Sequence, residues 1–214
     1  LAELAEVEMH AIQTSGNCIR NITTDQFAGV AADEVIDPRP LAEILRQWST
    51  FHPEFAFLPR KFKIAISGTK DDRAVTWFHD IGLQLQEQNG ETGFRVIVGG
   101  GLGRTPIRGQ VVREFLPWQH ILTYCEAILR VYNRQGRRDN AYKARIKILV
   151  QALGVEAFAQ LVEDEWAHGK DGPATITQAE FDRVAAHFAA PAYEALTEPE
   201  LPSEKAFKNW VDRS

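Results

Sequence analysis

The stretch Leu58-Pro59-Arg60-Lys61-Phe62-Lys63-Ile64-Ala65-Ile66 (residues 58–66) opens the predicted sheet of this chain. Pro59 lacks an amide donor and restricts the residue before it to extended backbone, so it suits the start of a strand. Because strand side chains alternate, Lys61 and Lys63 are predicted to share one face, opposite Phe62. Two ammonium groups on one face repel each other unless an anion or solvent lies between them. On these residues alone, a solvated edge whose lysines prevent aggregation is the better interpretation, and an anion site is the alternative.

Further strands are predicted downstream of this stretch. The first is Phe62–Ser67; residues 74–79 and 81–86 are candidates for a second, and residues 93–98 form another. Asn89-Gly90 indicates a hairpin between the last two, because a type I′ turn needs positive φ at both central residues. The sequence therefore predicts a sheet built from the middle third of the chain.

Several stretches carry the three- and four-residue apolar spacing of amphipathic helices. One is predicted to start at Asp37-Pro38, with the aspartate as cap, and to end before His52. The most regular pattern runs from Val111 to Tyr132 and predicts one helix ended by Gly136. Other helices are predicted over 1–13, from about Tyr142 to Leu153, around Phe158 to Trp166, and after the capping box Thr177-Gln178-Ala179-Glu180. Together these elements predict an α+β fold, a mixed or antiparallel sheet with helices packed on it.

The composition is that of an ordinary globular protein. The 214 residues are 44% hydrophobic and 25% charged, which suits one large domain or two closely packed ones. The net charge of −5 argues against a surface that binds nucleic acid generally. The predicted organisation is a module over 1–190 and a proline-containing connector over 191–214.

Cys18 and Cys125 are the only cysteines. Two thiols without metal-ligand spacing predict no disulfide scaffold and no metal site, and favour a reducing, cytoplasmic location. Cys18 is interpreted as a small buried hydrophobic residue, and the six histidines show no zinc-binding spacing. No apolar run approaches the length of a membrane span, so no membrane partner is expected. A chain that begins at Leu1, with Met9 as its one methionine, is expected to be an excised piece or a processed product.

A glycine-rich stretch, Gly99-Gly100-Gly101-Leu102-Gly103-Arg104, is the second candidate site after the lysines. Glycines let the backbone approach a ligand closely and aim successive amides at anionic oxygens. The spacings of a P-loop and of a dinucleotide fingerprint are both absent. A glycine-rich exit from the hairpin explains the stretch equally well, although Arg104 and Arg108 favour an anion slightly.

Two further groups of polar residues are candidates. Arg20 offers a planar fork for carboxylates, and Asn21 both donates and accepts hydrogen bonds; alone, Arg20 fits a surface residue in a polar loop. A basic stretch is formed by Arg130, Arg134, Arg137, Arg138, Lys143, Arg145 and Lys147. A solvated helical hairpin is preferred there over a nucleic-acid surface, and a face toward an acidic electron-donor protein remains equally open.

Taken together, these motifs resemble the sirohaem-dependent sulfite/nitrite reductase family. The resemblance covers about residues 12 to 165, and Pro-Arg-Lys-Phe-Lys is its most specific part. It is carried by Asn17-Cys18-Ile19-Arg20-Asn21, Leu58-Pro59-Arg60-Lys61-Phe62-Lys63, Val98-Gly99-Gly100-Gly101-Leu102, Arg137-Arg138-Asp139-Asn140-Ala141, Ala144-Arg145 and Gly154-Val155-Glu156-Ala157-Phe158. Members are similar in having two pseudo-symmetric halves, each with a ferredoxin-like piece and a sirohaem-domain module. Sirohaem and a 4Fe–4S cluster lie between the modules.

The resemblance implies roles for the candidate residues. Arg20, Lys61 and Lys63 would lie on the distal face of sirohaem and bind sulfite or nitrite. They would stabilise charge as S–O or N–O bonds weaken, and the lysines would help to deliver protons. The implied cofactor contacts are these three residues with Asn21, Gly99, Gly100, Gly101, Gly103 and Arg104. Nitrite-type members often carry Asn at the position of Lys63, so sulfite is favoured.

Two departures from the family pattern shape the expectation. The cysteines that bind the cluster are absent from this chain, and Cys18 and Cys125 cannot replace a clustered set of thiolates. A further distal-face arginine, expected upstream of Leu1, is missing as well. The chain is expected to be the first sirohaem-domain module of a sulfite reductase, ending where a second ferredoxin-like piece would begin. Alone, it is expected to be inactive and to bind sirohaem weakly or not at all. Electrons would come from a flavoprotein or ferredoxin.

Alternatives to this expectation remain open. Within the family they are a nitrite reductase and the cobalamin-pathway relative. Outside it they are a non-catalytic module that binds an anion or a tetrapyrrole, and a nucleic-acid-binding hairpin over 130–147.

Overall fold

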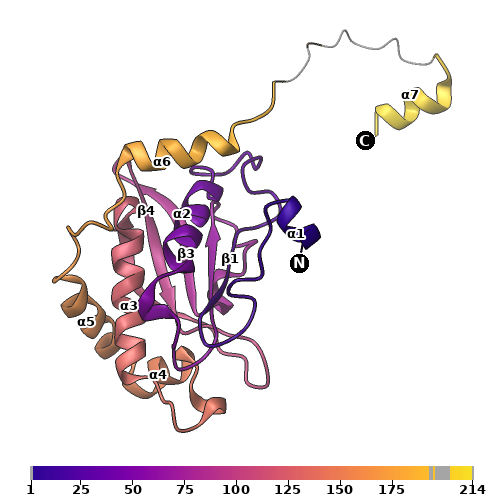
Figure 1. Ribbon diagram of the computed structural model, residues 1–214. Coiled ribbons are helices and arrows are strands. Elements are labelled where there is room, and N and C mark those ends of the chain that lie inside the picture. Colours follow the sequence, from indigo (N-terminus) through magenta and orange to yellow (C-terminus); the bar gives the residue numbers. More distant parts are fainter. Residues whose placement is uncertain (1, 193–194, 196–202, 214) are drawn as a thin grey trace.

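The chain folds around a mixed sheet. The computed structural model describes residues 2–192, 195 and 203–213. Within that part, five strands lie in sequential order: β1 (Ile19–Thr23), β2 (Phe62–Ser67), β3 (Ile81–Gln88), β4 (Glu91–Val98) and β5 (Gln110–Pro117). The first three strands are parallel to one another, and the β3–β4 and β4–β5 pairs are antiparallel. This arrangement confirms the predicted α+β fold with a mixed sheet (Figure 1).

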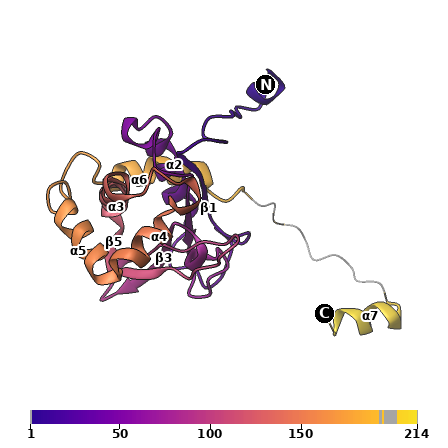
Figure 2. The same cartoon turned by 90° about the horizontal axis from the view of Figure 1, so that it is seen from below.

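Helices lie before, between and after these strands in the sequence. They are α1 (Ala2–Glu6), α2 (Arg39–Thr50), α3 (Ile121–Gln135), α4 (Ile146–Leu153), α5 (Val155–Trp166), α6 (Gln178–Ala185) and α7 (Lys205–Val211) in the described part of the chain. Short 3₁₀ turns lie at η1 (Pro53–Phe55), η2 (Thr76–Phe78), η3 (Trp118–His120), η4 (Ala141–Lys143) and η5 (Ala186–Phe188). Helices α2 and α3 lie side by side over one face of the sheet in both views (Figures 1 and 2).

The hydrophobic core lies between that face and the helices. Alternation sends Phe62, Ile64 and Ile66 of β2 to the same side, and all three are fully buried. They pack with buried residues of β3 and β4 and with Leu41 and Leu45 of α2 in one cluster. Residues of the opposite parity on β2 are therefore left for the other face of the sheet, and Lys63 is among them.

The predicted helix over residues 111–132 is wrong in its first part. Residues 110–117 form β5, which pairs with β4, and the helix begins only at Ile121 after the turn η3. Pro117 lacks the amide that a helix interior requires, so a helix cannot run through it undisturbed. The predicted end is confirmed, because α3 stops at Gln135 and Gly136 follows. Of the two candidates for the second strand, 81–86 is confirmed within β3, and 74–79 instead contains η2.

Local turn and cap signals behaved largely as expected. Asn89 and Gly90 have φ of 54° and 81°, as the predicted hairpin turn requires. The Thr177 hydroxyl accepts a hydrogen bond from the Glu180 amide at 3.2 Å, which confirms the cap of α6. Helix α2 begins at Arg39 with Pro38 at its N-cap position, so the prediction of Asp37 as the cap is wrong by one residue; the Asp37 carboxylate still accepts a hydrogen bond from the Arg39 amide at 2.9 Å.

The two ends of the chain differ from their predictions in detail. Helix α1 covers residues 2–6 rather than 1–13. In the predicted connector, residues 199 and 202 lie outside the described residues, and Lys205–Val211 is helical rather than extended. The ring of Trp210 lies 5.9 Å from that of Phe207 within α7. The division into a module over 1–190 and a connector over 191–214 stays a prediction.

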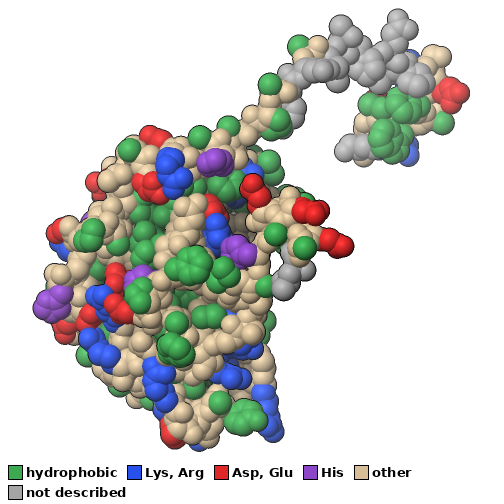
Figure 3. All heavy atoms as spheres, in the orientation of Figure 1, with side chains coloured by type: hydrophobic (Ala, Val, Ile, Leu, Met, Phe, Trp, Pro, Cys, Tyr) green, Lys and Arg blue, Asp and Glu red, His purple; other side chains and the backbone are tan. Residues whose placement is uncertain are grey.

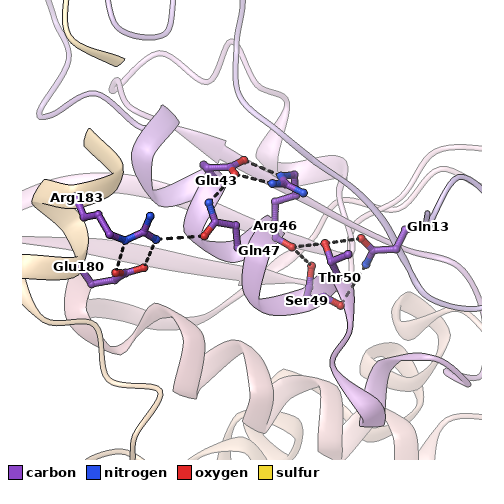
Figure 4. Close-up of polar contacts among 8 residues, drawn as sticks. All are labelled: Gln13, Glu43, Arg46, Gln47, Ser49, Thr50, Glu180 and Arg183. Carbon is purple, nitrogen blue, oxygen red and sulfur yellow. Dashed lines mark hydrogen bonds and ion pairs between the residues drawn. The ribbon is translucent and has the colours of Figure 1, made fainter. Parts of the chain in front are cut away.

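Polar contacts tie α2 to two distant segments (Figure 4). The Arg183 guanidinium of α6 donates to Gln47 of α2 at 3.3 Å, while Glu180 accepts its other hydrogen bonds. At the far end of α2, the Thr50 hydroxyl donates to Gln13 at 3.1 Å. These contacts hold both the segment before β1 and helix α6 against α2.

Candidate functional site

The ladder between β1 and β2 places Arg20 and Asn21 beside the lysine motif. Ile19 pairs with Phe62, but Asn21 pairs with Lys63, so two steps along β1 correspond to one step along β2. Arg20 is therefore the extra residue of a bulge, a device that re-aims side chains near functional sites. Although they are about 40 positions apart in the sequence, these two segments lie next to each other in the sheet.

Lys61 is the centre of a cationic cluster. Burial and the charges of Arg20, Arg145, Arg60 and Lys63, in that order of strength, hold the pKa of the Lys61 amine below its usual range. We use "cationic cluster" for these five residues: Arg20, Arg60, Lys61, Lys63 and Arg145. Like charges gathered in this way repel one another, and an anion among them removes that repulsion.

A cavity of about 320 Å³ opens beside Lys61. Five of its lining residues are cations, namely Arg60, Lys61, Arg104, Arg145 and Lys147, and none of the described lining residues is acidic. Its rim also carries two well-exposed apolar side chains, Leu102 and Tyr142. Figure 3 shows lysine and arginine side chains spread over the lower part of the molecule, in the region where Figure 1 labels α4. The cavity combines positive charge with apolar surface, which suits a ligand that is both anionic and partly hydrophobic.

Asp80 joins three parts of this site. One carboxylate oxygen accepts hydrogen bonds from Nε and Nη2 of Arg145 at 3.0 and 2.6 Å, and the other accepts from the Lys63 amide at 3.0 Å. The Asp80 carbonyl accepts from the Gly99 amide at 3.0 Å. Asp80 is fully buried, and burial raises the pKa of its carboxyl, although Arg145 and the Lys63 amide oppose that shift.

Further hydrogen bonds fix the cations that line this cavity. The Lys147 amine donates to the Thr105 carbonyl at 2.6 Å, and burial together with Arg145 lowers the pKa of that amine. The Tyr132 hydroxyl of α3 donates to the Ala144 carbonyl at 2.9 Å, next to Arg145 in the chain. Helix α3 and the loop after β4 thus hold Arg145 and Lys147 in place.

The glycine-rich stretch contributes to this site through packing. Gly99, Gly100 and Gly101 are buried; a Cβ added at Gly100 would lie 2.3 Å from the Trp77 carbonyl oxygen. An added Cβ at Gly101 would lie 3.1 Å from Arg145. Among the residues described, Leu102, Arg104 and Thr105 line the cavity, whereas none of the four glycines does. Gly99, Gly100 and Gly101 let the loop pack tightly under the site, whereas Gly103 is exposed and an added Cβ there would meet nothing within 4 Å. A role of the glycines as direct ligand contacts stays a prediction.

Not every predicted residue faces the same cavity. Arg20 and Asn21 line a different cavity of about 240 Å³, together with His10 and Arg46. Lys63 does not line the 320 Å³ cavity in the described structure, although its charge acts on Lys61. Lys61 and Arg104 are the predicted residues that line it directly.

Sequence reasoning assigned four residues of this site to no sirohaem or substrate role, namely Arg60, Asp80, Arg145 and Lys147, although it named Arg145 and Lys147 in the basic stretch. Arg60 lies inside the lysine motif, and Arg145 is part of the stretch that carries the family resemblance, so both had a signal. Asp80 has none, because an aspartate before a strand usually faces solvent.

The remaining members of the basic stretch are largely paired with acids or carbonyl groups. Arg130 forms ion pairs with Glu54 at 2.7 Å and Glu126 at 2.6 Å, and Arg134 pairs with Glu165. Paired guanidinium groups offer little net charge to a phosphate backbone. This arrangement favours the solvated, internally paired hairpin over a nucleic-acid surface.

The described residues include no group of three or more His, Cys, Asp or Glu side chains placed to hold a metal ion. Cys125 is buried, whereas Cys18 is only half-buried, so the expectation that Cys18 is buried is wrong. No helix in the described part of the chain is long and apolar enough to cross a membrane.

Known proteins of similar sequence include sulfite and nitrite reductases. The chain is 34% identical over 174 residues to sulfite reductase (ferredoxin) 1 of Mycolicibacterium paratuberculosis, covering 80% of this chain and 31% of that protein. It is 30% identical over 175 residues to the chloroplastic ferredoxin–nitrite reductase of Arabidopsis thaliana, covering 79% and 30%. The solved structure of the Mycobacterium tuberculosis NirA protein matches with a TM-score of 0.72 and 30% identity, over 80% of this chain and 32% of that one.

The chain spans about a third of the length of these relatives. The family described as "Nitrite and sulphite reductase 4Fe-4S domain" matches residues 15–170, which include the cationic cluster and the loop after β4. With a match over most of its length, this chain belongs to the nitrite and sulphite reductase family.

Proposed function

We propose that this chain is the sirohaem-domain module of a sulfite reductase and supplies its cationic face for substrate and cofactor. The observation that carries the proposal is the position of Lys61, which lies among four other cations and beside a cavity without acidic lining residues. A carboxylate-rich ring and a small oxyanion are both ligands that such a surface can hold.

The residues fit sirohaem by their chemistry. The cations of the cavity wall would hold its carboxylates, and Leu102 and Tyr142 offer apolar surface to a ring. Asn21, Gly99, Gly100, Gly101, Gly103 and Arg104 complete the proposed cofactor contacts. When bound, sirohaem supplies the iron at which sulfite is reduced.

The described residues do not fit a 4Fe–4S cluster. Such a cluster needs a set of cysteine thiolates, and the sequence contains only Cys18 and Cys125. Its ligands would come from a part of the enzyme that this chain does not include.

Arg20, Lys61 and Lys63 are the proposed substrate residues. Their charges would bind sulfite and stabilise negative charge that develops on its oxygens. Burial and neighbouring cations lower the pKa of Lys61, so this amine gives up a proton more readily than an ordinary lysine. Because nitrite-type members of the family often carry Asn at the position of Lys63, a lysine there favours sulfite as the substrate. Nitrite reduction is the second candidate, since relatives of both kinds match the chain.

The partners follow from the relatives. Because several of them are named for ferredoxin, we propose ferredoxin as the electron donor, in preference to a flavoprotein. A cytoplasmic location remains our proposal for the parent enzyme. We expect the 214-residue chain alone to be inactive, and turnover of sulfite by this chain with reduced viologen would contradict that expectation.

The test uses the full-length protein that contains this chain. Its absorption spectrum is expected to show sirohaem bands, and sulfite turnover with reduced viologen is expected to exceed nitrite turnover. Lys61→Gln and Lys63→Gln should lower turnover far more than sirohaem content, while Lys70→Gln, an exposed lysine outside the cluster, should change neither. Absence of sirohaem would sink the proposal. Equal losses of turnover and cofactor would assign the lysines to the macrocycle instead of the substrate.

A further inference from the structure

We propose that Asp80 is a positioning residue, which orients the Arg145 guanidinium toward the anion site and fixes the backbone of Lys63. The inference rests on the proposed function, because it concerns how the same cavity binds its anion. Asp80 lies between the turn η2 and β3 and is separated by 65 positions from Arg145.

The geometry of the guanidinium carries the first step. Arg145 uses Nε and Nη2 toward one oxygen of Asp80, at 3.0 and 2.6 Å. A guanidinium is a rigid planar fork with five donors, so gripping this edge leaves the donors of Nη1 on the opposite side. The Arg145 side chain lines the cavity and is 18% exposed. The held edge thus sets the direction in which the remaining donors point.

The second step concerns Lys63. The other oxygen of Asp80 accepts a hydrogen bond from the Lys63 amide at 3.0 Å. Lys63 pairs with Asn21 across the sheet, so the same carboxylate links Arg145 to the ladder that carries Arg20. The buried Asp80 carboxylate therefore sets the spacing between Arg145 and the cations of the β1–β2 ladder, Arg20 and Lys63.

The charge of Asp80 allows a positioning role to be distinguished from a purely electrostatic one. Asp80 is the one carboxylate to which a member of the cationic cluster is ion-paired in the described structure. If Asp80 acted only through its charge, it would weaken anion binding by cancelling a cation, and removing that charge would strengthen binding. A positioning role has the opposite consequence, because an unheld guanidinium loses the geometry that the anion requires.

The experiment uses the full-length protein that contains this chain and measures its affinity for sulfite by calorimetry and its sirohaem content by absorption. We expect Asp80→Asn to weaken sulfite binding by about tenfold, the effect of losing one hydrogen bond to a charged group. This loss is expected although the substitution removes a negative charge from the site. The matched control is Glu163→Gln, which removes a carboxylate from the Arg113 ion pair outside the site and should leave both the sulfite affinity and the sirohaem content within about twofold, as expected for a distant charge.

A double-mutant cycle protects the test against loss of fold. On an Arg145→Gln background, Asp80→Asn should have little further effect on anion binding, because an asparagine oxygen can still accept from the Lys63 amide and the rest of the effect passes through Arg145. The double variant also leaves no unpaired buried charge, so it should retain a cooperative thermal transition. Unchanged or tighter binding by Asp80→Asn, or fully additive effects in the cycle, would overturn the positioning role. A wild-type full-length protein that contains no sirohaem would instead refute the proposed function.

Discussion

Asn21 pairs with Lys63 across the β1–β2 ladder, although Ile19 pairs with Phe62 only two residues earlier. The mismatch of one residue makes Arg20 a bulge and brings the polar Arg-Asn pair next to the lysine motif. A regular ladder would have paired Arg20 itself with Lys63. The register of this one strand pair therefore decides which polar groups meet at the cationic cluster.

Replacing Lys61 is expected to leave the fold intact or to stabilise it. Its lowered folded-state pKa means that between this pKa and 10.5 the unfolded chain binds more protons, so the folded state carries an electrostatic cost at neutral pH. We expect Lys61→Gln to raise the free energy of unfolding by up to about 0.5 kcal/mol at low salt, and the gain to shrink at high salt. Urea titration measures both values, with Lys70→Gln as control. A loss above about 1 kcal/mol would mean that Lys61 is held by contacts that stabilise it.

The stability of the fold is expected to fall as the pH drops below about 6.5, the ordinary pKa of histidine. Burial lowers the pKa of His52, whose ring stacks on Phe55 with centroids 3.9 Å apart. Between the folded-state pKa and 6.5 the unfolded state binds the extra proton, so stability is present at higher pH and is lost as the pH falls.

The contribution of His52 is bounded by about 1.4 kcal/mol per pH unit. We expect His52→Asn to flatten the dependence between pH 7 and about pH 5, two units within the titration range of histidine, as measured by urea unfolding. His168→Asn changes an exposed histidine and serves as control. The same slope in the His52 variant and in the wild type would assign the pH dependence to other groups.

The two cysteines should differ in reactivity. Burial raises the pKa of the Cys125 thiol to about 12, and it raises the pKa of the half-buried Cys18 as well. Because the thiolate is the reactive form, iodoacetamide should modify Cys18 slowly and Cys125 only after unfolding. Mass spectrometry of native and urea-unfolded samples, with Cys18→Ser as reference, distinguishes the two. Rapid native labelling of Cys125 would show that the core around it opens.

A methyl group at Gly100 should disturb the loop under the cavity. Its Cβ would lie 2.3 Å from the Trp77 carbonyl oxygen and 2.7 Å from that of His79. Both neighbours are backbone atoms, so the chain itself must shift, and we expect Gly100→Ala to cost about 1–3 kcal/mol. Gly169→Ala is the control, since an added Cβ there meets nothing within 4 Å. Thermal unfolding compares the two, and equal midpoints would show that the loop yields easily.

Local chemistry alone predicted much of this molecule. Asn89-Gly90 specified a tight turn, and Thr177 specified a helix start, because both effects act over a few residues. The apolar alternation after Pro59 predicted β2 and the face on which Lys63 lies. The same short-range signals misled at residues 111–117, where apolar spacing fits two periods and pairing with β4 decides between them.

The site itself depended on contacts between distant segments. The strand register set the bulge at Arg20, and chain folding brought Arg145 and Lys147 to the wall of the Lys61 cavity. The partnership of Asp80 with Arg145 has no local signal, because a carboxylate becomes a buried anchor only when the folded chain excludes water from it. Charge type and strand face were properties of the sequence, whereas the meeting of those charges was decided by tertiary packing.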